Sequence, residues 1–302
     1  MIQIKPPIVA SQPKAHRLKR ILNRPMNFLL DMRDLQRIAI ALSKGAAMMG
    51  ARSIDLTLPA TWEFSGFSQN GEDGILDVLR KNLLSSNRYF IEVGAADGIE
   101  NNTGWLLVAE KYNGMLIEGS AQLVERAKRT VVGYSIGAEC HNMFVTKESV
   151  RDMKEMALHH DPDVFSLDID GNDYYIAQAI LENGFRPKIF VVEYNSVYGA
   201  ERSMTIEYQP DFVVTSAHPT HLYYGVSISG WRKFFDGYGY RFVTVDRNGV
   251  NGFFVDPEFF DKSFLDGVKG LTFADNQSQL KKFRTPSENQ FSLIAEQMFV
   301  SI

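Results

Sequence analysis

Short apolar runs alternate with longer amphipathic segments between residues 88 and 194, and this alternation constrains the fold more than any other feature. Each apolar run is six or seven residues long and rich in β-branched and aromatic side chains. Strands that alternate with helices predict βαβ units, and therefore a mostly parallel sheet with helices on both faces. The expected strands are 88–93, 113–118, 131–136, 163–168 and 188–194.

Two more strand-like runs, 240–246 and 250–255, flank Asn248-Gly249 near the C-terminal end. Asn-Gly is a strong signal for a tight hairpin turn, so an antiparallel hairpin is expected to complete the sheet. With right-handed crossovers, these elements predict a Rossmann-like, doubly wound α/β fold with a mostly parallel seven-stranded sheet. The expected division is a basic helical extension over 1–60, the Rossmann-like domain over 61–256, and a C-terminal tail over 257–302 that packs on it.

Charge is distributed unevenly along the chain. Residues 1–52 hold ten Lys and Arg against two Asp, a charge of +8, which leaves −12 for the rest of a chain whose total is −4. Apolar residues between 15 and 49 recur at helical spacing, and Pro25 predicts a break into two helices. Residues 1–13 are expected to form an irregular arm. The basic helices are expected to pack on the domain or in a homo-oligomer, or to contact an anionic membrane.

The composition excludes several classes of protein. With 45% hydrophobic and 23% charged residues, the chain has the composition of an ordinary globular protein. Cys140 is the only cysteine, so a disulfide framework and a Cys-based zinc site are excluded, and a cytoplasmic location is expected. The sequence shows neither an apolar run of 18 residues nor a secretory-signal pattern. The charge of −12 outside the N-terminal segment disfavours a nucleic-acid partner.

A Gly- and Ala-rich turn follows the first predicted strand, in FIEVGAADGIENNT at 90–103. Ligands of open α/β sheets bind at the carboxyl ends of the strands, and small residues let a ligand approach the backbone. The spacing Gly94-x-x-x-Gly98 is neither a dinucleotide nor a P-loop signature. A carboxylate in or beside this turn would repel phosphate but suits a cationic ligand such as S-adenosylmethionine, which has sulfonium and ammonium groups. Glu118, which ends the second predicted strand, is expected to accept hydrogen bonds from ribose hydroxyls.

Oxygen-bearing side chains end two later strands, as Asp168 and Asp170 and as Glu193 and Asn195. Residues i and i+2 of an extended segment point the same way, so these side chains are expected to converge. They would hold Mg²⁺, with Asp168, Glu193 and Asn195 as ligands, or act without metal, with Asp168 or Asp170 as a general base. An Asp-x-Asp metal site is also compatible with a glycosyltransferase.

The segment SAHPTHLYYGVS, residues 216–227, supplies two further candidate bases, His218 and His221, because imidazole titrates near neutrality. It is expected to line an acceptor pocket, with Tyr223, Tyr224 and Trp231 stacking on sugar faces. In SQNGEDGIL, residues 68–76, Gln69 is expected to close over the cofactor.

Together SQNGEDGIL, FIEVGAADGIENNT, GMLIEGS, LDIDGNDYYI and VVEYNS resemble FkbM-related S-adenosylmethionine-dependent methyltransferases over about residues 67–255. The resemblance implies O-methylation of a small-molecule or glycan hydroxyl, with adenine near 140–142. Typical members have Asp-x-Glu-Gly where this chain has Asp168-Ile169-Asp170-Gly171. A non-catalytic cofactor- or partner-binding module remains a third alternative. The implied cofactor-binding residues are Gln69, Glu92, Gly94, Ala95, Asp97, Gly98, Asn102, Glu118 and Asp168.

Overall fold

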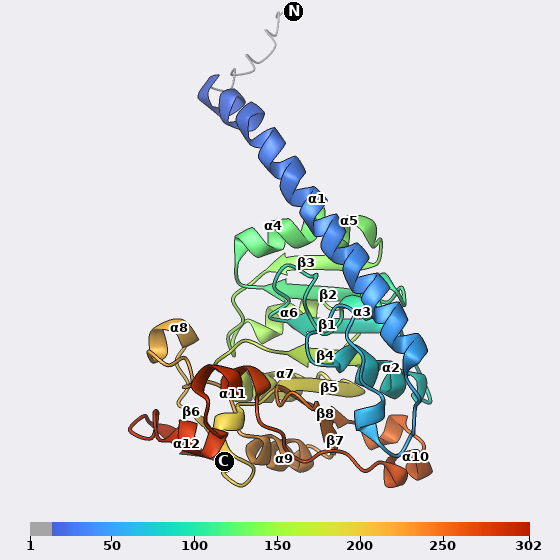
Figure 1. Ribbon diagram of the computed structural model, residues 1–302, viewed down its shortest axis with the longest axis vertical. Helices are drawn as coiled ribbons and strands as arrows, with labels where there is room; N and C mark the ends of the chain where they lie inside the picture. Colours follow the sequence, from blue (N-terminus) through green and yellow to red (C-terminus); the bar gives the residue numbers. More distant parts are fainter. Residues whose placement is uncertain (1–13) are drawn as a thin grey trace, which may run out of the picture.

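A seven-stranded sheet forms the centre of the molecule (Figure 1). The computed structural model describes residues 14–302, with side chains for 32–133 and 135–302, so the expected irregular arm over 1–13 lies outside the described residues. Strands β1 to β5 pair in parallel, and β8 pairs antiparallel with both β5 and β7. The predicted Rossmann-like fold with its C-terminal hairpin is confirmed. Across the sheet the strands are β3 (Ala138–Asn142), β2 (Asn113–Glu118), β1 (Tyr89–Val93), β4 (Val164–Leu167), β5 (Ile189–Glu193), β8 (Asn251–Val255) and β7 (Arg241–Val245).

Helices cover both faces of the sheet because successive strand residues point to opposite sides. Phe90 belongs to the core on one face, whereas Ile91 belongs to the core on the other. From β1 the strand order runs in one direction through β2 and β3, and in the other direction through β4 and β5. The order thus reverses between β1 and β4, and a ligand site is expected at the carboxyl ends of these two strands. The first face carries α2 (Glu72–Lys81), α3 (Gly104–Val108), α4 (Ala121–Arg129), α5 (Val131–Tyr134) and α10 (Lys262–Gly267); the second carries α6 (Val150–Met156), α7 (Asp173–Glu182) and α9 (Ile228–Gly237).

The prediction of a third strand over residues 131–136 was wrong. Residues Val131–Tyr134 form α5, and Val131 is buried in the core of the first face. The strand instead is β3, AECHN, in which Ala138 and Cys140 are buried while Glu139 is exposed. A strand at the edge of a sheet pairs on one side only, so it needs little apolar character and gives a weak sequence signal.

Helix α1 (Lys14–Ala51) is continuous, so the predicted break at Pro25 was also wrong. Proline removes one hydrogen-bond donor but has a φ compatible with a helix, and the other hydrogen bonds continue on both sides. Figure 1 shows α1 crossing the face of the sheet that carries α2 to α5 and projecting beyond the edge at β3.

The C-terminal half of α1 is tied to the domain by ion pairs and close packing. Asp34, only 1% exposed, accepts a hydrogen bond of 2.9 Å from Arg126 of α4. Arg37 lies 2.5 Å from Asp97 in the turn after β1. Gly45 packs so closely on Trp105 of α3 that a Cβ there would lie 2.4 Å from the indole ring. Helix α1 therefore contacts the Gly-rich turn directly.

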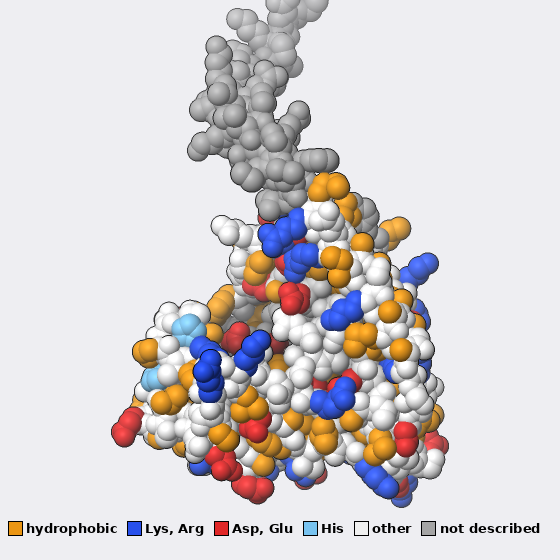
Figure 2. Space-filling model, viewed as in Figure 1, with side chains coloured by type: hydrophobic (Ala, Val, Ile, Leu, Met, Phe, Trp, Pro, Cys, Tyr) orange, Lys and Arg blue, Asp and Glu red, His pale blue; other side chains and the backbone are white. Residues whose placement is uncertain are grey.

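The outward face of α1 carries exposed apolar side chains. Met32, Leu35, Ile40 and Met48 are 40–65% exposed. Hydrophobic side chains appear as separate patches along the right side of Figure 2, where α1 runs in Figure 1. Within residues 14–302, no helix has the length and apolar character needed to cross a bilayer.

A small lobe is built from the segment after β5 and the end of the chain. β6 (Met204–Ile206) pairs antiparallel with β9 (Phe299–Ser301), around a third apolar cluster that includes Tyr198, Tyr224 and Ile294. This lobe lies beside α7 and the end of β5 (Figure 1). Its other elements are η2 (Ser196–Tyr198), α8 (Val214–Ala217), α11 (Gln277–Phe283) and α12 (Ser287–Phe291); η1 (Pro59–Thr61) and η3 (Pro257–Phe259) lie outside it.

Candidate functional site

The turn after β1 packs directly on the segment after β4. Gly94 has a φ of +86°, and a Cβ at this position would lie 1.7 Å from the carbonyl oxygen of Asp168. The backbone N–H of Asp168 in turn donates to the carbonyl of Val93 at 3.1 Å. Glycine is therefore required at residue 94, and its close approach sets Asp168 beside the turn.

A cavity of 390 Å³ opens at the carboxyl ends of β1, β2 and β4, as the reversal in strand order predicts. It is lined by Gly94 and Ala96 of the turn after β1, by Glu118 at the end of β2, and by Asp168 and Asp170 after β4. The volume falls in the usual range for ligand pockets, roughly 300–1,000 Å³.

One end of this cavity is apolar and is formed by Met143, Phe144 and Val145, directly after β3. Phe144 is 55% exposed. Residues 140–142 were expected near the adenine by the family resemblance, but Cys140 is buried within β3 and Asn142 donates to the carbonyls of Glu118 and Gly119. The residues that line the cavity come directly after them.

Glu118 lines the cavity as expected. One carboxylate oxygen accepts from the N–H of Ala96 at 3.0 Å, and the other accepts from the N–H of Ser120 at 2.7 Å. Each oxygen keeps a free lone pair, because a carboxylate offers about four acceptor positions. Glu118 can therefore accept hydrogen bonds from two further hydroxyl groups.

Glu92 supports the loop that leads into α3. Its carboxylate accepts from the N–H groups of Asn102 at 2.9 Å and Thr103 at 3.2 Å, and from the Thr103 hydroxyl at 2.5 Å. Burial raises the pKa of Glu92 to about 7. It lines a second, smaller cavity of 100 Å³ that shares Gly94 and Asp168 with the larger one. Its carboxyl group is thus mostly engaged within the protein.

Asp97 does not face either cavity. Its carboxylate lies 2.5 Å from Arg37 of α1 and 3.2 Å from Arg126 of α4. The expectation that Asp97 contacts the cofactor is therefore corrected: two arginines from distant helices neutralise it. Ala95 and Gly98 shape the turn without lining the larger cavity, and Gly98 packs against Val131 with a φ of +73°.

Gln69 and Asn102 both line the smaller cavity. The Gln69 amide donates to Glu100 at 2.9 Å, which joins the segment before α2 to the loop after β1. The Asn102 side chain donates to the Ser166 hydroxyl of β4 at 3.1 Å. Both residues are thus beside the Gly94 turn.

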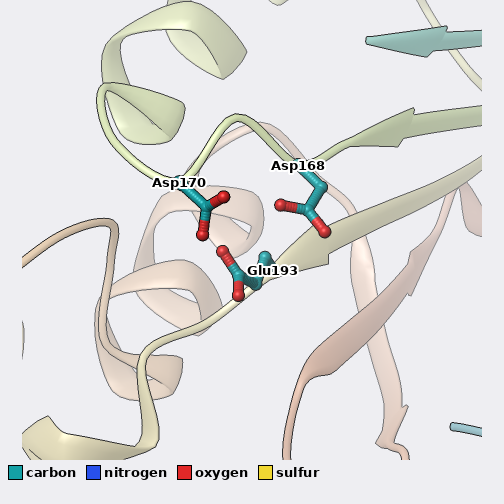
Figure 3. Close-up of side chains that lie close together, drawn as sticks. All are labelled: Asp168, Asp170 and Glu193. Atoms are coloured by element: carbon teal, nitrogen blue, oxygen red, sulfur yellow. The ribbon is translucent and has the colours of Figure 1, made fainter. Parts of the chain in front are cut away.

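Three of the predicted carboxylates converge. Asp168 and Asp170 from the loop after β4 and Glu193 from the end of β5 point toward one another (Figure 3). One oxygen of each lies within 4.8 Å of an oxygen of the others. The cluster is therefore compact enough to share a proton or to surround a cation.

Burial raises the pKa of Asp168, and the negative charges of Asp170 and Asp173 raise it further. Burial and the charge of Asp168 raise the pKa of Glu193 in the same way. A hydrogen bond between the two carboxyl groups lowers the pKa of Asp168 and raises that of Glu193. Burial and mutual repulsion therefore favour a state in which the pair holds a proton.

The loop that carries Asp168 and Asp170 is held in place by Asp173. Its carboxylate accepts from the N–H of Ile169 at 3.0 Å and from the N–H of Gly171 at 2.8 Å. Asp170 adopts a left-handed backbone conformation with a φ of +52° and is exposed at the cavity. Asp173 is thus a positioning residue for the cluster.

Asn195 is not brought into the cluster. Its amide donates to the carbonyls of Leu222 at 2.8 Å and Tyr224 at 3.1 Å, and its oxygen accepts from the N–H of Val197 at 3.2 Å. The expectation that Asn195 is a metal ligand is corrected, because its side chain instead forms hydrogen bonds within the turn after β5 and to the segment 222–224 of the lobe.

The two candidate histidines also lie away from the carboxylates. His218 pairs with the Thr220 hydroxyl at 2.8 Å, and His221 is exposed. Neither lines the cavity. Their expected role as bases has no geometric support, since a base must reach the proton that it takes.

The expected sugar-stacking aromatics are core residues. Trp231 is fully buried and donates to the carbonyl of Glu193 at 2.8 Å, and Tyr223 is 5% exposed. Tyr224 is also buried, but its hydroxyl lies 3.4 Å from a carboxylate oxygen of Glu193. Tyr224 is therefore a neighbour of the acidic cluster and not an exposed ring on which a sugar could stack.

No protein-family model and no curated protein matches the chain. Among solved structures, an O-methyltransferase from Bacillus cereus bound to S-adenosylhomocysteine aligns over 72% of this chain and 89% of its own, with 14% identity and a TM-score of 0.41. The O-methyltransferase TomG from Streptomyces achromogenes, bound to S-adenosylmethionine, aligns over 70% and 94%, with 17% identity and a TM-score of 0.41.

The chain spans about half, 49%, of the METTL16 methyltransferase domain, at 14% identity over 40% of this chain and a TM-score of 0.31. All three of these solved structures are methyltransferases. The fold of this chain is assigned from its observed strand order.

Proposed function

We propose that this chain is an S-adenosylmethionine-dependent O-methyltransferase that acts on a hydroxyl of a glycan or glycosylated metabolite. The observation that carries the proposal is the 390 Å³ cavity, in which the Gly94 turn and Glu118 face Asp168 and Asp170. Assignment to the FkbM-related methyltransferases is part of the same proposal and rests on the sequence motifs. The carboxylates also support a sugar acceptor, since they accept hydrogen bonds from several hydroxyls at once.

The residues present fit the cofactor. Met143, Phe144 and Val145 offer an apolar surface suited to adenine, and Glu118 retains free lone pairs for two ribose hydroxyls. Glu92, Glu100 and Asp168 line the cavities around Gly94 and supply the negative potential that a sulfonium and an ammonium group require. When bound, the cofactor supplies an electrophilic methyl group.

Asp168 is the group best placed to accept the proton of the acceptor hydroxyl as that oxygen forms its new bond to the methyl carbon. It lines the cavity beside the Gly94 turn, and a hydrogen bond from Glu193 lowers its pKa. Exposed Asp170 would accept a hydrogen bond from a neighbouring hydroxyl and orient the acceptor.

Titration calorimetry tests the proposal. S-adenosylhomocysteine is expected to bind with a dissociation constant on the order of micromolar, whereas UDP-glucose is expected not to bind, with or without Mn²⁺. Binding of the nucleotide sugar without binding of S-adenosylhomocysteine would instead assign the chain to the glycosyltransferases. Cofactor binding without methyl transfer to any hydroxylated acceptor would favour a non-catalytic module.

Turnover is expected to be unchanged by EDTA, because the base in this proposal is a carboxylate of the chain and needs no cation. The measurement is the transfer of labelled methyl groups with EDTA, with EDTA plus excess Mg²⁺, and with neither. Loss of activity in EDTA that Mg²⁺ restores would contradict this expectation. Asp168, Asp170 and Glu193 would then be the ligands of a cation that lowers the pKa of the acceptor hydroxyl.

A further inference from the structure

Helix α1 carries two stripes of side chains, and one of them attaches the helix to its own domain. Asp34, Ala41 and Gly45 are buried, and Ile38 is half-buried against the core on this face of the sheet. Residues in an α-helix are about 100° apart around the axis, so these four positions lie within one narrow stripe. This first stripe faces the domain.

The second stripe of α1 lies about a quarter turn from the first and follows a regular repeat. Its members, called the seam below, are spaced three and four residues apart in turn: Met32, Leu35, Ala39, Leu42, Ala46 and Met49. The seam is exposed at four of these positions and half-buried at Leu42 and Met49. Apolar residues at alternating spacings of three and four are the pattern by which one helix packs along another. The seam therefore fits a second helix with the same repeat.

The order of large and small side chains makes the seam complementary to itself. We consider a second copy of α1 that runs antiparallel, with the centre of the pair between residues 40 and 41. The side chains that then lie opposite each other are Met32 and Met49, Leu35 and Ala46, and Leu42 and Ala39. Each leucine thus meets an alanine of the other copy, which fills the space between the helices evenly. A parallel pair would instead place alanine opposite alanine and leave gaps.

Charge favours the same antiparallel arrangement. Residues 1–52 carry +8, whereas the rest of the chain carries −12. Helix α1 projects beyond the edge of its own domain at β3 (Figure 1), so an antiparallel pair directs the basic end of each copy toward the acidic domain of the other. A parallel pair would bring the two basic ends together, and like charges repel.

We propose that the seam of α1 is a homodimer interface, in which two copies of the helix pack antiparallel about a two-fold axis. Such a contact uses the same surface on both subunits, as most dimers do. On the other side of the domain-facing stripe, Lys44 and Met48 line a cavity together with Gln69 and Asn70, which also line the smaller cavity beside Gly94. The dimer would therefore leave the proposed cofactor site open.

Size-exclusion chromatography with light scattering on the full chain tests the proposal. The unsubstituted protein is expected to be a dimer. Leu35→Lys is expected to raise the dissociation constant of the dimer at least about 100-fold, because each dimer would bury two unpaired ammonium groups. Leu35 is 40% exposed and lies outside the buried core, so the melting temperature of the subunit and its affinity for S-adenosylhomocysteine are expected to be unchanged.

Ile40→Lys is the matched control, because it makes the same replacement on the same helix at a position outside the seam that is 65% exposed. This variant is expected to remain a dimer. Ala46→Glu alone is expected to weaken the dimer, whereas Ala46→Glu combined with Leu35→Lys is expected to restore it. Each ammonium group then faces a carboxylate of the other copy, while within one helix the two residues lie roughly 16 Å apart.

A monomeric unsubstituted protein would overturn the proposal. If that monomer sediments with vesicles of phosphatidylcholine and phosphatidylserine but not with phosphatidylcholine alone, α1 binds an anionic membrane instead. A Leu35→Lys variant that stays dimeric, or an Ile40→Lys variant that becomes monomeric, would show that the seam is not the interface. A double variant that remains monomeric would exclude the antiparallel pairing. None of these outcomes affects the proposed function, which is tested by cofactor binding.

Discussion

Replacing Asp168 by asparagine is expected to reduce methyl transfer by about 10²- to 10⁴-fold, the usual contribution of a general base. Asparagine has the same shape but cannot accept the hydroxyl proton. The affinity for S-adenosylhomocysteine should largely remain, since Glu118 and the Gly94 turn are untouched. Single-turnover transfer of a labelled methyl group measures the first effect, and calorimetry measures the second.

Stability serves as the internal control for Asp168→Asn. The pKa of Asp168 is raised in the folded protein, so the ionised carboxylate destabilises the ligand-free fold at neutral pH. The neutral variant should therefore melt at the same temperature or higher. Unchanged turnover in a folded variant would exclude Asp168 as the base.

The same cluster predicts a pH dependence. Transfer needs ionised Asp168, so activity should fall as the pH drops through its raised pKa. After burial, the charge of Asp170 is the largest cause of that raised pKa. Asp170→Asn removes this charge and should move the acid limb of the pH–rate profile to lower pH, even where the rate itself is reduced. An acid limb that stays in place or moves upward would show that Asp168 does not control it.

Gly94→Ala is expected to destabilise the protein by about 3 kcal/mol or more and to abolish cofactor binding. The added Cβ would lie 1.7 Å from the carbonyl oxygen of Asp168, and the φ of +86° is unfavourable for alanine. Either the turn or the segment after β4 must move, and both line the cavity. Urea unfolding and calorimetry with S-adenosylhomocysteine measure the two effects.

Gly237→Ala is the matched control for Gly94. Gly237 ends α9, and a Cβ there would meet nothing within 4 Å. Alanine at this position is expected to leave cofactor binding unchanged and to stabilise the helix by about 0.5–1 kcal/mol. If Gly94→Ala left both the stability and the cofactor binding as intact as Gly237→Ala does, the close packing of the turn against Asp168 would not be needed for cofactor binding.

Local patterns were sufficient for the elements whose side chains face a core. Strands β1, β4, β5 and β8 were predicted because their apolar runs are fully buried, and β2 and the edge strand β7 because each still carries three apolar side chains. The edge strand β3, AECHN, was missed because only Ala138 and Cys140 of its five residues are apolar and buried. The same reasoning predicted that Asp168, Asp170 and Glu193 converge, since the carboxyl ends of parallel strands share one edge of the sheet.

The sequence by itself determined the Rossmann-like sheet, the Gly94 turn, Glu118 at the end of β2, and the acids after β4 and β5. All of these depend on strand periodicity and on the common direction of parallel strands. Only the tertiary structure decided which polar groups are already paired. Asp97 is bound by Arg37 and Arg126, Asn195 by the lobe, and Asn251 by Glu72. Hydrogen bonds and ion pairs between segments far apart in the chain leave no periodic trace in a sequence, because they depend on how the elements meet in space.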